Sequence, residues 1–230
     1  MDPSEEARSP RDEAHHNPDI EVIPTGTFQA NCYLVTCPTT GDTMVVDPGA
    51  DAERILEHIR RRSLTVVIIL HTHGHFDHIG ATEAVLAGLG LSVPVAAHPA
   101  DAYLYEHDAR AIGAQFGYAL PATLATPDVP LADGDELRVG ELRLRVLTTP
   151  GHTPGSISLL CGSQGVFSGD TLFRRGIGRT DLSGSDEDAI YESILTRLYP
   201  LASELAVYPG HGPTTTIGEE RRSNPFVQAP

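Results

Sequence analysis

Residue types that bind metals gather in one short stretch of this chain. His73, His75, Asp77 and His78 stand within six positions of one another. A continuous apolar run at 66–70 comes just before them, as expected for a strand that is buried on both faces and ends where polar side chains begin. Neutral imidazole and carboxylate are the ligands that zinc and similar divalent metals accept. The stretch therefore predicts a metal site, and the alternative is a histidine-rich surface turn.

Three later segments each place a single potential ligand at the end of an apolar strand. His152 lies in a turn bounded by proline and glycine, Asp170 ends the strand expected at 165–170, and His211 follows the one expected at 204–210. A tight turn sets the direction of a side chain through the backbone, and the ligands of open α/β sheets lie beyond strand ends. One such turn alone is usually structural. Four segments of this kind together predict one shared metal site.

The elements that would carry these ligands fall into two similar halves. Strands at 28–35 and 43–49 begin the first half, and from residue 131 onward strands again precede a helix, at 186–198. Apolar residues at period 2 indicate the strands, and an apolar stripe at helical spacing indicates the helix. The pattern predicts the α/β class, with two mixed β-sheets packed face to face and helices on both outer faces, a four-layer αβ/βα sandwich.

Length and composition fit one sizeable domain. The chain has 230 residues, of which 40% are hydrophobic, and this is enough for a packed core. We expect a flexible acidic tail at 1–19, the domain at 20–226 and a short C-terminal tail at 227–230. No apolar run approaches the roughly 18 residues that a membrane-spanning helix needs, so no membrane association is expected.

Charge and cysteine content limit the possible partners. The net charge of −15 comes from 16 basic and 31 acidic residues, and such a balance repels phosphate backbones, which argues against nucleic acid as a partner. Three cysteines without a paired spacing fit free thiols in a reducing cytoplasm. Neither observation identifies a partner, and the sequence predicts no oligomeric state.

Four motifs resemble those of the metallo-β-lactamase superfamily. They are HGHFDH (73–78), PGHTPGS (150–156), SGDTLF (168–173) and YPGHGP (208–213), and the resemblance covers roughly residues 20–226. Within that superfamily the chain is most similar to short glyoxalase II-like hydrolases, also called hydroxyacylglutathione hydrolase-like proteins. The resemblance implies the αβ/βα sandwich and two divalent metal ions between the sheets. Zinc is the expected metal, with iron or manganese as alternatives.

The resemblance also implies a role for each ligand. The implied ligands of one metal are His73, His75 and His152, those of the second are Asp77, His78 and His211, and Asp170 would bridge the two. By the same resemblance, Asp77 and Asp170 count as catalytic. His71 falls outside the motif and is expected to pack or to support the ligands. Asp47 is expected either to accept a hydrogen bond behind the ligands or to form a turn.

The activity implied by the resemblance is hydrolysis of a small acyl thioester such as S-lactoylglutathione. A water shared by two cations loses a proton near neutral pH, and the hydroxide would attack the carbonyl carbon. Arg179 stands where glyoxalase II has a basic residue that holds a glutathione carboxylate, so it is a candidate substrate ligand; pairing with an acidic neighbour is the alternative. Asp181 and Pro213 stand where tyrosines are expected, which leaves the acyl group and the thiol carrier open.

Other functions of the same ligand set stay open. A persulfide dioxygenase with one iron shares the ligands and the segments at 178–181 and 219–225, while HGP (211–213) and VVDPG (45–49) favour the hydrolase. A lactonase or β-lactamase is a third option, and a purely structural metal site is a fourth, although structural zinc sites are closed and often rich in cysteine. Residues 99–120 are expected to lie over or beside the site.

Overall fold

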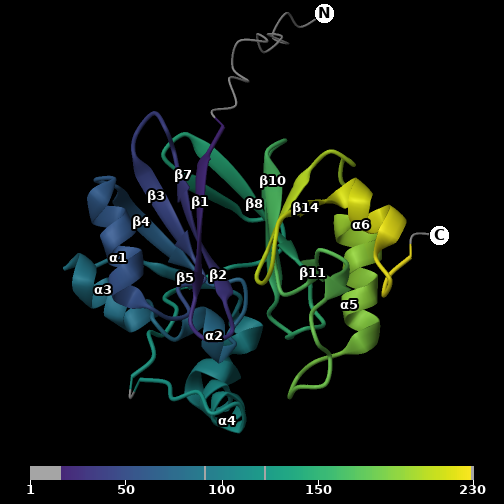
Figure 1. Ribbon diagram of the computed structural model, residues 1–230, viewed down its shortest axis with the longest axis horizontal. Helices are drawn as coiled ribbons and strands as arrows, with labels where there is room; N and C mark the ends of the chain where they lie inside the picture. The colour runs from purple at the N-terminus through teal and green to yellow at the C-terminus, as the bar shows by residue number, and fades with distance from the viewer. Residues whose placement is uncertain (1–16, 91, 122, 229–230) are drawn as a thin grey trace, which may run out of the picture.

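Two six-stranded sheets face each other in the computed structural model, which describes residues 17–90, 92–121 and 123–228 (Figure 1). Helices lie on the outer side of each sheet, α1 and α3 on one and α5 and α6 on the other. The layers therefore run helix, sheet, sheet, helix. This arrangement confirms the αβ/βα sandwich predicted from the sequence.

The first sheet belongs to the N-terminal half and is mixed. Its order is β1 (Asp19–Thr25), β2 (Ala30–Thr36), β3 (Asp42–Val46), β4 (Thr65–Leu70), β5 (Val95–Ala97) and β6 (Val129–Pro130). The first three strands pair antiparallel, and the strands from β3 to β6 pair in parallel. Helices α1 (Ala52–Arg61) and α3 (Thr82–Leu89) pack against it through Ile55, Ile59 and Val85.

The second sheet belongs to the C-terminal half and is also mixed. Its order is β14 (Thr215–Thr216), β13 (Ala206–Pro209), β10 (Gly165–Gly169), β9 (Ile157–Cys161), β8 (Leu142–Thr148) and β7 (Glu136–Val139). Strands β10 and β13 pair in parallel and the other neighbours pair antiparallel. Helix α5 (Glu187–Ser193), the π-helical turn η3 (Ile194–Leu198) and α6 (Ile217–Ser223) cover its outer face with Ile190 and Ile217.

The main apolar core fills the space between the two sheets. Tyr33, Val35 and Met44 of the first sheet form one cluster with Leu144 and Phe167 of the second. These side chains are at most 3% exposed. Because burying a large apolar side chain contributes about 1.5–3 kcal/mol, this cluster holds the sheets together and fixes the strand ends that carry the ligands.

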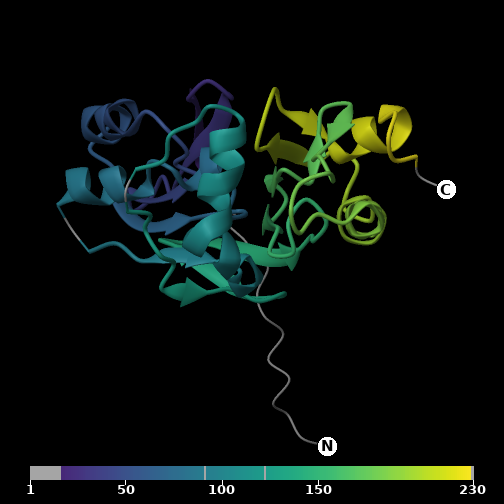
Figure 2. The same cartoon turned by 90° about the horizontal axis from the view of Figure 1, so that it is seen from below.

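Short elements lie at the end of the sandwich where the ligands are found. They are α2 (Phe76–Ile79), the 3₁₀ helix η1 (Pro99–Asp101), the π-helical turn η2 (Leu104–Asp108), α4 (Ala109–Gln115) and the hairpin of β11 (Leu172–Phe173) with β12 (Gly176–Ile177). Seen from below, the segment from η1 to α4 lies where the two halves meet (Figure 2). None of the helices within the described residues is long and apolar enough to cross a membrane.

The structure differs from the sequence prediction at both edges of the domain. Strand β1 is an additional strand, and Asp19, which the prediction assigned to the tail, opens it and binds Arg62. Val227, assigned to the C-terminal tail, is 3% exposed in the second-half core, and its carbonyl accepts the Tyr199 hydroxyl at 2.9 Å. Local composition did not show these contacts because both are made with distant helices. Residues 1–16 of the tail predicted at 1–19 lie outside the described residues.

Candidate metal centre

The end of β4 builds one side of the site. His73 and His75 follow β4 in a turn, and Asp77 and His78 lie in α2, where the His78 N–H donates to the His75 carbonyl at 3.0 Å. The three histidines are at most 3% exposed. A buried strand that runs into one turn of helix therefore holds four ligand-type side chains close together, as the spacing predicted.

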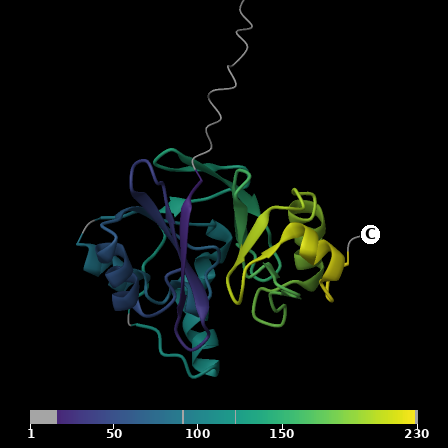
Figure 3. The same ribbon diagram turned by 45° about the horizontal axis from the view of Figure 1, so that its top comes forward.

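The second half supplies one side chain from each of three strand ends. His152 lies in the turn between β8 and β9, Asp170 directly follows β10, and His211 follows β13. The Asn31 side chain holds the last of these turns by donating to two of its carbonyls, both at 2.9 Å. The loop after β13 also pairs with the start of β2 through His211 and Ala30, and Figure 3 shows these two segments side by side.

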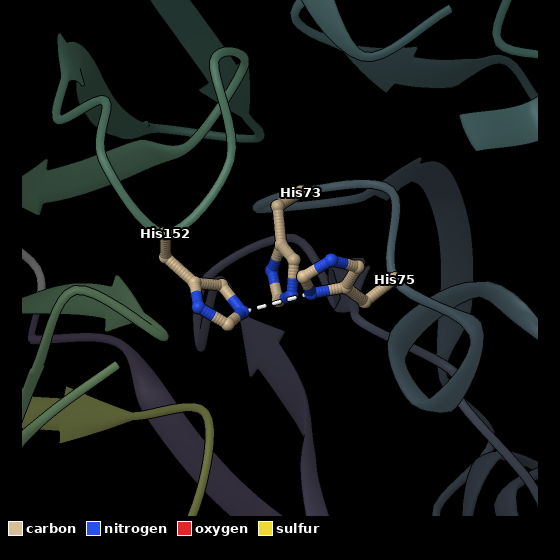
Figure 4. A group of neighbouring side chains, drawn as sticks. All are labelled: His73, His75 and His152. Carbon is tan, nitrogen blue, oxygen red and sulfur yellow. Dashed lines mark hydrogen bonds between the residues drawn. The ribbon is translucent and has the colours of Figure 1, made fainter. Parts of the chain in front are cut away.

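Three overlapping groups of side chains lie close enough to hold a metal ion. The first is His73, His75 and His152, the second is Asp77, His78 and His211, and a third combines Asp47 with His73 and His78. Within each group the candidate ligand atoms lie within 4.8 Å of one another. Figure 4 shows the three rings of the first group turned toward a common space from both halves, with Nδ1 of His75 2.8 Å from Nε2 of His152. In the second group the Nε2 atoms of the two histidines are 3.2 Å apart.

Asp170 lies between the first two groups. Its carboxylate oxygens are 3.5 Å from the Nε2 atoms of His78, His152 and His211 alike. A glycine at position 210 makes room for it, since a Cβ there would lie 2.0 Å from Oδ1 of Asp170. One carboxylate thus reaches ligands of both groups, which is the geometry that a bridging residue needs.

Buried polar atoms without a partner indicate that the site is built around cations. Among the described residues, Nε2 of His73, Nε2 of His75 and Oδ1 of Asp170 are buried without a hydrogen-bond partner. Leaving such an atom unpaired costs about 1–3 kcal/mol. All three belong to the candidate ligands, and imidazole and carboxylate lone pairs suit a divalent metal ion. The residues present therefore fit a metal centre.

Burial keeps the first group of histidines uncharged. Desolvation lowers the pKa of His73 well below its ordinary value and that of His75 to about 3. Burial also lowers the pKa of His152, although the Asp170 carboxylate acts in the opposite direction. Because a metal binds the lone pair of the neutral ring, these three side chains are in the ligating form at neutral pH.

The second group differs from the first because two carboxylates, those of Asp77 and Asp170, lie close to its histidines. Burial acts to lower the pKa values of His78 and His211, but the charges of Asp170 and Asp77 outweigh it and raise both. Burial likewise acts to raise the pKa values of these two carboxyls, and the neighbouring histidines more than offset it, so both are lowered. Within the part of the chain that the structure describes, both carboxylates form ion pairs with histidines alone. Two ionised carboxylates in a largely buried site require nearby positive charge, which metal ions supply.

Asp47 supports the ligand turn from behind. Its Oδ1 accepts the Thr72 N–H at 2.7 Å, and its Oδ2 accepts the Thr72 hydroxyl at 2.6 Å and lies 3.0 Å from Nδ1 of His78. The carboxylate is 1% exposed. Both oxygens are occupied, so Asp47 orients His78 as a hydrogen-bond acceptor, the first of the two roles predicted for it.

Asp101 ties two ligand turns together, and the sequence reasoning did not identify it. Its Oδ2 accepts the Gly74 N–H and the Thr153 hydroxyl, both at 2.8 Å, and its Oδ1 accepts the Gly155 N–H at 2.7 Å. Gly74 belongs to the turn after β4, and the other two residues belong to the turn after β8. A lone aspartate in a segment of mixed pattern carries no sequence signal for such a role. The segment does lie beside the site, as expected for residues 99–120.

Two other histidines near strand ends have different partners. His71 is fully buried, with Nδ1 2.8 Å from the Tyr105 hydroxyl and Nε2 2.7 Å from the Thr82 hydroxyl. It packs beneath the ligand turn, as predicted. The ring of His98 accepts the Ala100 N–H and lines a separate cavity.

A cavity of about 310 Å³ opens onto the candidate ligands. Five of the seven line it, namely His75, Asp77, His152, Asp170 and His211. Arg179 also lines this cavity, and its guanidinium donates to both carboxylate oxygens of Asp181, at 2.6 and 2.8 Å. A larger groove of about 1020 Å³, which includes Gly49 and Tyr118, is lined by none of the seven. The open side of the centre is therefore the smaller cavity.

The fold and the ligand pattern define the class of this protein. The family model described as the metallo-β-lactamase superfamily matches residues 25–221. The chain belongs to the metallo-β-lactamase superfamily, as its four motifs indicated.

Individual relatives within the superfamily match over nearly their full length. Hydroxyacylglutathione hydrolase GloC of Haemophilus influenzae is 36% identical over 92% of this chain and 99% of its own length. The B3 metallo-β-lactamase BLEG-1 shares 39% identity and a TM-score of 0.84, with 91% of this chain and 99% of that one covered. The protein TTHA1623, solved in a di-iron-bound form, shares 41% identity and a TM-score of 0.81, with 90% and 100% covered.

Proposed function

We propose that this protein is a metal-dependent hydrolase that cleaves a small acyl thioester of the S-lactoylglutathione type. The observation that carries the proposal is the open side of the centre, since five of the seven ligand-type side chains line a cavity. A structural zinc site is closed by four protein ligands, whereas a catalytic site keeps a position for water or substrate. The similarity to a hydroxyacylglutathione hydrolase supports a thioester as the substrate.

The ligand groups suggest how two ions would be held. We assign one ion to His73, His75 and His152, the second to Asp77, His78 and His211, and contact with both to Asp170. Zinc is the first choice, followed by iron and manganese, and the di-iron-bound neighbour supports a centre of two ions. Bound ions of this kind polarise a carbonyl and generate a nucleophile from water at neutral pH.

The protein's own residues prepare the site for this chemistry. Asp77 and Asp170 line the cavity, so we regard them as the catalytic residues that face the reacting carbonyl. Asp47 holds His78, and Asp101 holds the two turns on either side of the first group. Because these supports are fixed by buried hydrogen bonds, the ligands need little rearrangement during the reaction.

Metal content and hydrolysis together test the proposal. Protein loaded with zinc, iron or manganese is assayed with S-lactoylglutathione, with a β-lactam, and with glutathione persulfide in an oxygen electrode. We expect two ions per chain and thioester hydrolysis that a chelator abolishes. One iron per chain with rapid oxygen uptake would identify a persulfide dioxygenase instead. Cleavage of the β-lactam alone would favour a β-lactamase-type hydrolase.

The expected setting of this reaction is the cytoplasm, with no nucleic acid or membrane as partner. The three cysteines are free and buried, as in proteins of reducing compartments. The net charge of −15 disfavours anionic polymers as substrates.

A further inference from the structure

The lining of the cavity beyond the candidate metal ligands is mostly apolar. Apart from Arg179, it consists of Phe28, Phe76, Phe116, Phe173, Ile177 and Leu182. These side chains come from both halves of the molecule. Phe28 and Phe116 are 36% and 40% exposed, although such large apolar side chains are usually covered. Exposed aromatic rings beside a reactive centre indicate a surface that a ligand covers.

Three of these rings form an aromatic wall, which we define as Phe28, Phe76 and Phe116. The ring of Phe28 meets Phe76 edge to face at 5.3 Å and Phe116 at 5.9 Å between centroids, and Phe76 stacks on Phe116 at 6.0 Å. Tyr118 packs against Phe76 at 5.0 Å. Aromatic pairs at these distances attract one another, so the wall is formed before a ligand binds and ordering it costs the ligand little.

Arg179 offers little net charge to a ligand. Among the described residues it is the only arginine that lines the cavity, and the chain contains no lysine. Two nitrogens of its guanidinium donate to both oxygens of Asp181, and its Cζ lies 5.2 Å from the centroid of the Phe116 ring. Asp181 therefore occupies the Nε/Nη2 edge of the guanidinium, one of the edges through which an arginine binds a carboxylate. A thiol carrier with a carboxylate has to compete with Asp181 for this position.

We infer that the natural substrate is a thioester with an apolar acyl group, on a carrier that meets the aromatic wall with an uncharged part. This inference rests on the proposed thioester hydrolysis and narrows it. The cavity volume of about 310 Å³ is at the small end of the range for ligand sites, so it suits an acyl group of phenylacetyl size better than a whole glutathione conjugate. In the reaction the C–S bond breaks, the hydroxyl of water joins the acyl carbon, and sulfur leaves as a thiol with the remaining proton.

Four thioesters separate the contribution of the acyl group from that of the carrier. The lactoyl and phenylacetyl groups are each attached to glutathione and to neutral N-acetylcysteamine, and kcat/KM is measured with the zinc-loaded full chain. The apolar area of a phenyl ring should favour phenylacetyl over lactoyl by about tenfold or more on either carrier. Glutathione should give no advantage over the neutral carrier.

Each result of this comparison has one meaning. Absence of a phenylacetyl preference, or a tenfold advantage of the glutathione carrier, would overturn the inference and leave the proposed hydrolase intact. Hydrolysis of none of the four by the metal-loaded protein would overturn the proposed function itself.

Two exposed positions test the cavity rim residue by residue. Phe116→Ala should lower kcat/KM for phenylacetyl thioesters about tenfold and leave kcat/KM for lactoyl thioesters within about twofold. Phe226→Ala, which removes an exposed ring outside the cavity, should change neither value.

Asp181→Asn removes the carboxylate that pairs with Arg179 and should lower KM for glutathione thioesters about threefold, the size of an exposed ion pair. Glu204→Gln is the matched charge control. An unchanged KM in Asp181→Asn would show that Asp181 does not weaken carboxylate binding.

Discussion

The two halves of the molecule supply the metal centre in different ways. The N-terminal half places four ligand-type side chains in one continuous stretch, 73–78, and holds it with two buried carboxylates, Asp47 and Asp101. Neither carboxylate is a proposed metal ligand. Support in this half therefore depends on side chains that a single substitution can remove.

The C-terminal half uses separate strand ends and backbone supports. Nδ1 of His152 lies 2.8 Å from the Arg179 carbonyl, and Nδ1 of His211 lies 3.0 Å from the carbonyl of Phe28. A carbonyl oxygen is present whatever side chain the residue carries. Side chains also hold these two turns, because Asn31 binds the turn of His211 and Asp101 binds the turn of His152. The difference between the halves therefore concerns the rings: a carboxylate faces the ring of His78, whereas backbone carbonyls face the rings of His152 and His211.

The largest effect is expected where the two halves join, at Asp170. Asp170→Asn keeps the shape of the side chain and removes the charge that both ligand groups share. Since metal ions contribute several kcal/mol to the transition state, we expect kcat/KM to fall about 10³-fold. Metal analysis should find fewer than two ions per chain. Asp188→Asn, an exposed position in the same half, is the control, and a fully active, fully loaded Asp170→Asn variant would show that the halves are not joined through this residue.

A smaller effect is expected from the side-chain supports of the first half. In Asp47→Asn and Asp101→Asn, an amide NH2 replaces a carboxylate oxygen that accepts a hydrogen bond in the ligand turn. Metal affinity, measured in competition with a chelator, should therefore fall about 10–100-fold. Arg179→Ala is the matched test of the second half, because the oxygen that faces His152 belongs to the backbone and remains. Its metal affinity should be unchanged. Equal losses in all three variants would contradict the distinction between side-chain and backbone support.

The smallest effect is expected on stability, from an ion pair outside the site that joins β1 to α1. Glu21 accepts a hydrogen bond from Arg62 at 2.7 Å and lies 2.6 Å from Nδ1 of His58. Burial acts to raise the pKa of Glu21, but these two partners outweigh it and hold the pKa below its ordinary value of 4.5. A depressed carboxyl pKa stabilises the fold above the unfolded-state value, and this stabilisation is lost as the pH falls through the folded-state value.

The expected result for Glu21→Gln is therefore pH-dependent. The ion pair is partly exposed, so the substitution should lower the free energy of unfolding by about 1 kcal/mol or less. This corresponds to a decrease in Tm of at most about 2–4 °C at pH 7. The difference in Tm between Glu21→Gln and the native chain should shrink as the pH is lowered below about 4.5. Thermal melts of the metal-free proteins measure it, with Glu57→Gln on α1, the helix that carries His58, as control. A deficit that persists in acid would mean that charge is not its cause.

The ligand-type side chains that the structure brings together could be predicted from the sequence better than the residues that support them. His73, His75 and His78 are close along the chain, and the strand before them has an unambiguous apolar pattern, so local spacing was informative. Asp101 acts on a turn about fifty residues away, and Phe28 meets the ring of Phe116 from a distant part of the chain. Such contacts have no local pattern. Strand β1 was missed for a related reason, since it lies at the sheet edge and contains a proline.

The contact between β2 and the turn after β13 has a consequence for how the protein is made. The Asn31 N–H donates to the Gly210 carbonyl at 2.7 Å, and the Asn31 side chain binds the carbonyl of Pro209, 178 positions away. The histidines of the stretch 73–78 leave the ribosome long before His211. A nascent chain therefore contains four ligand-type side chains before the residues that complete the two groups have been synthesised. The centre becomes complete only when the second half docks on the first, so metal loading reports that the two halves have come together.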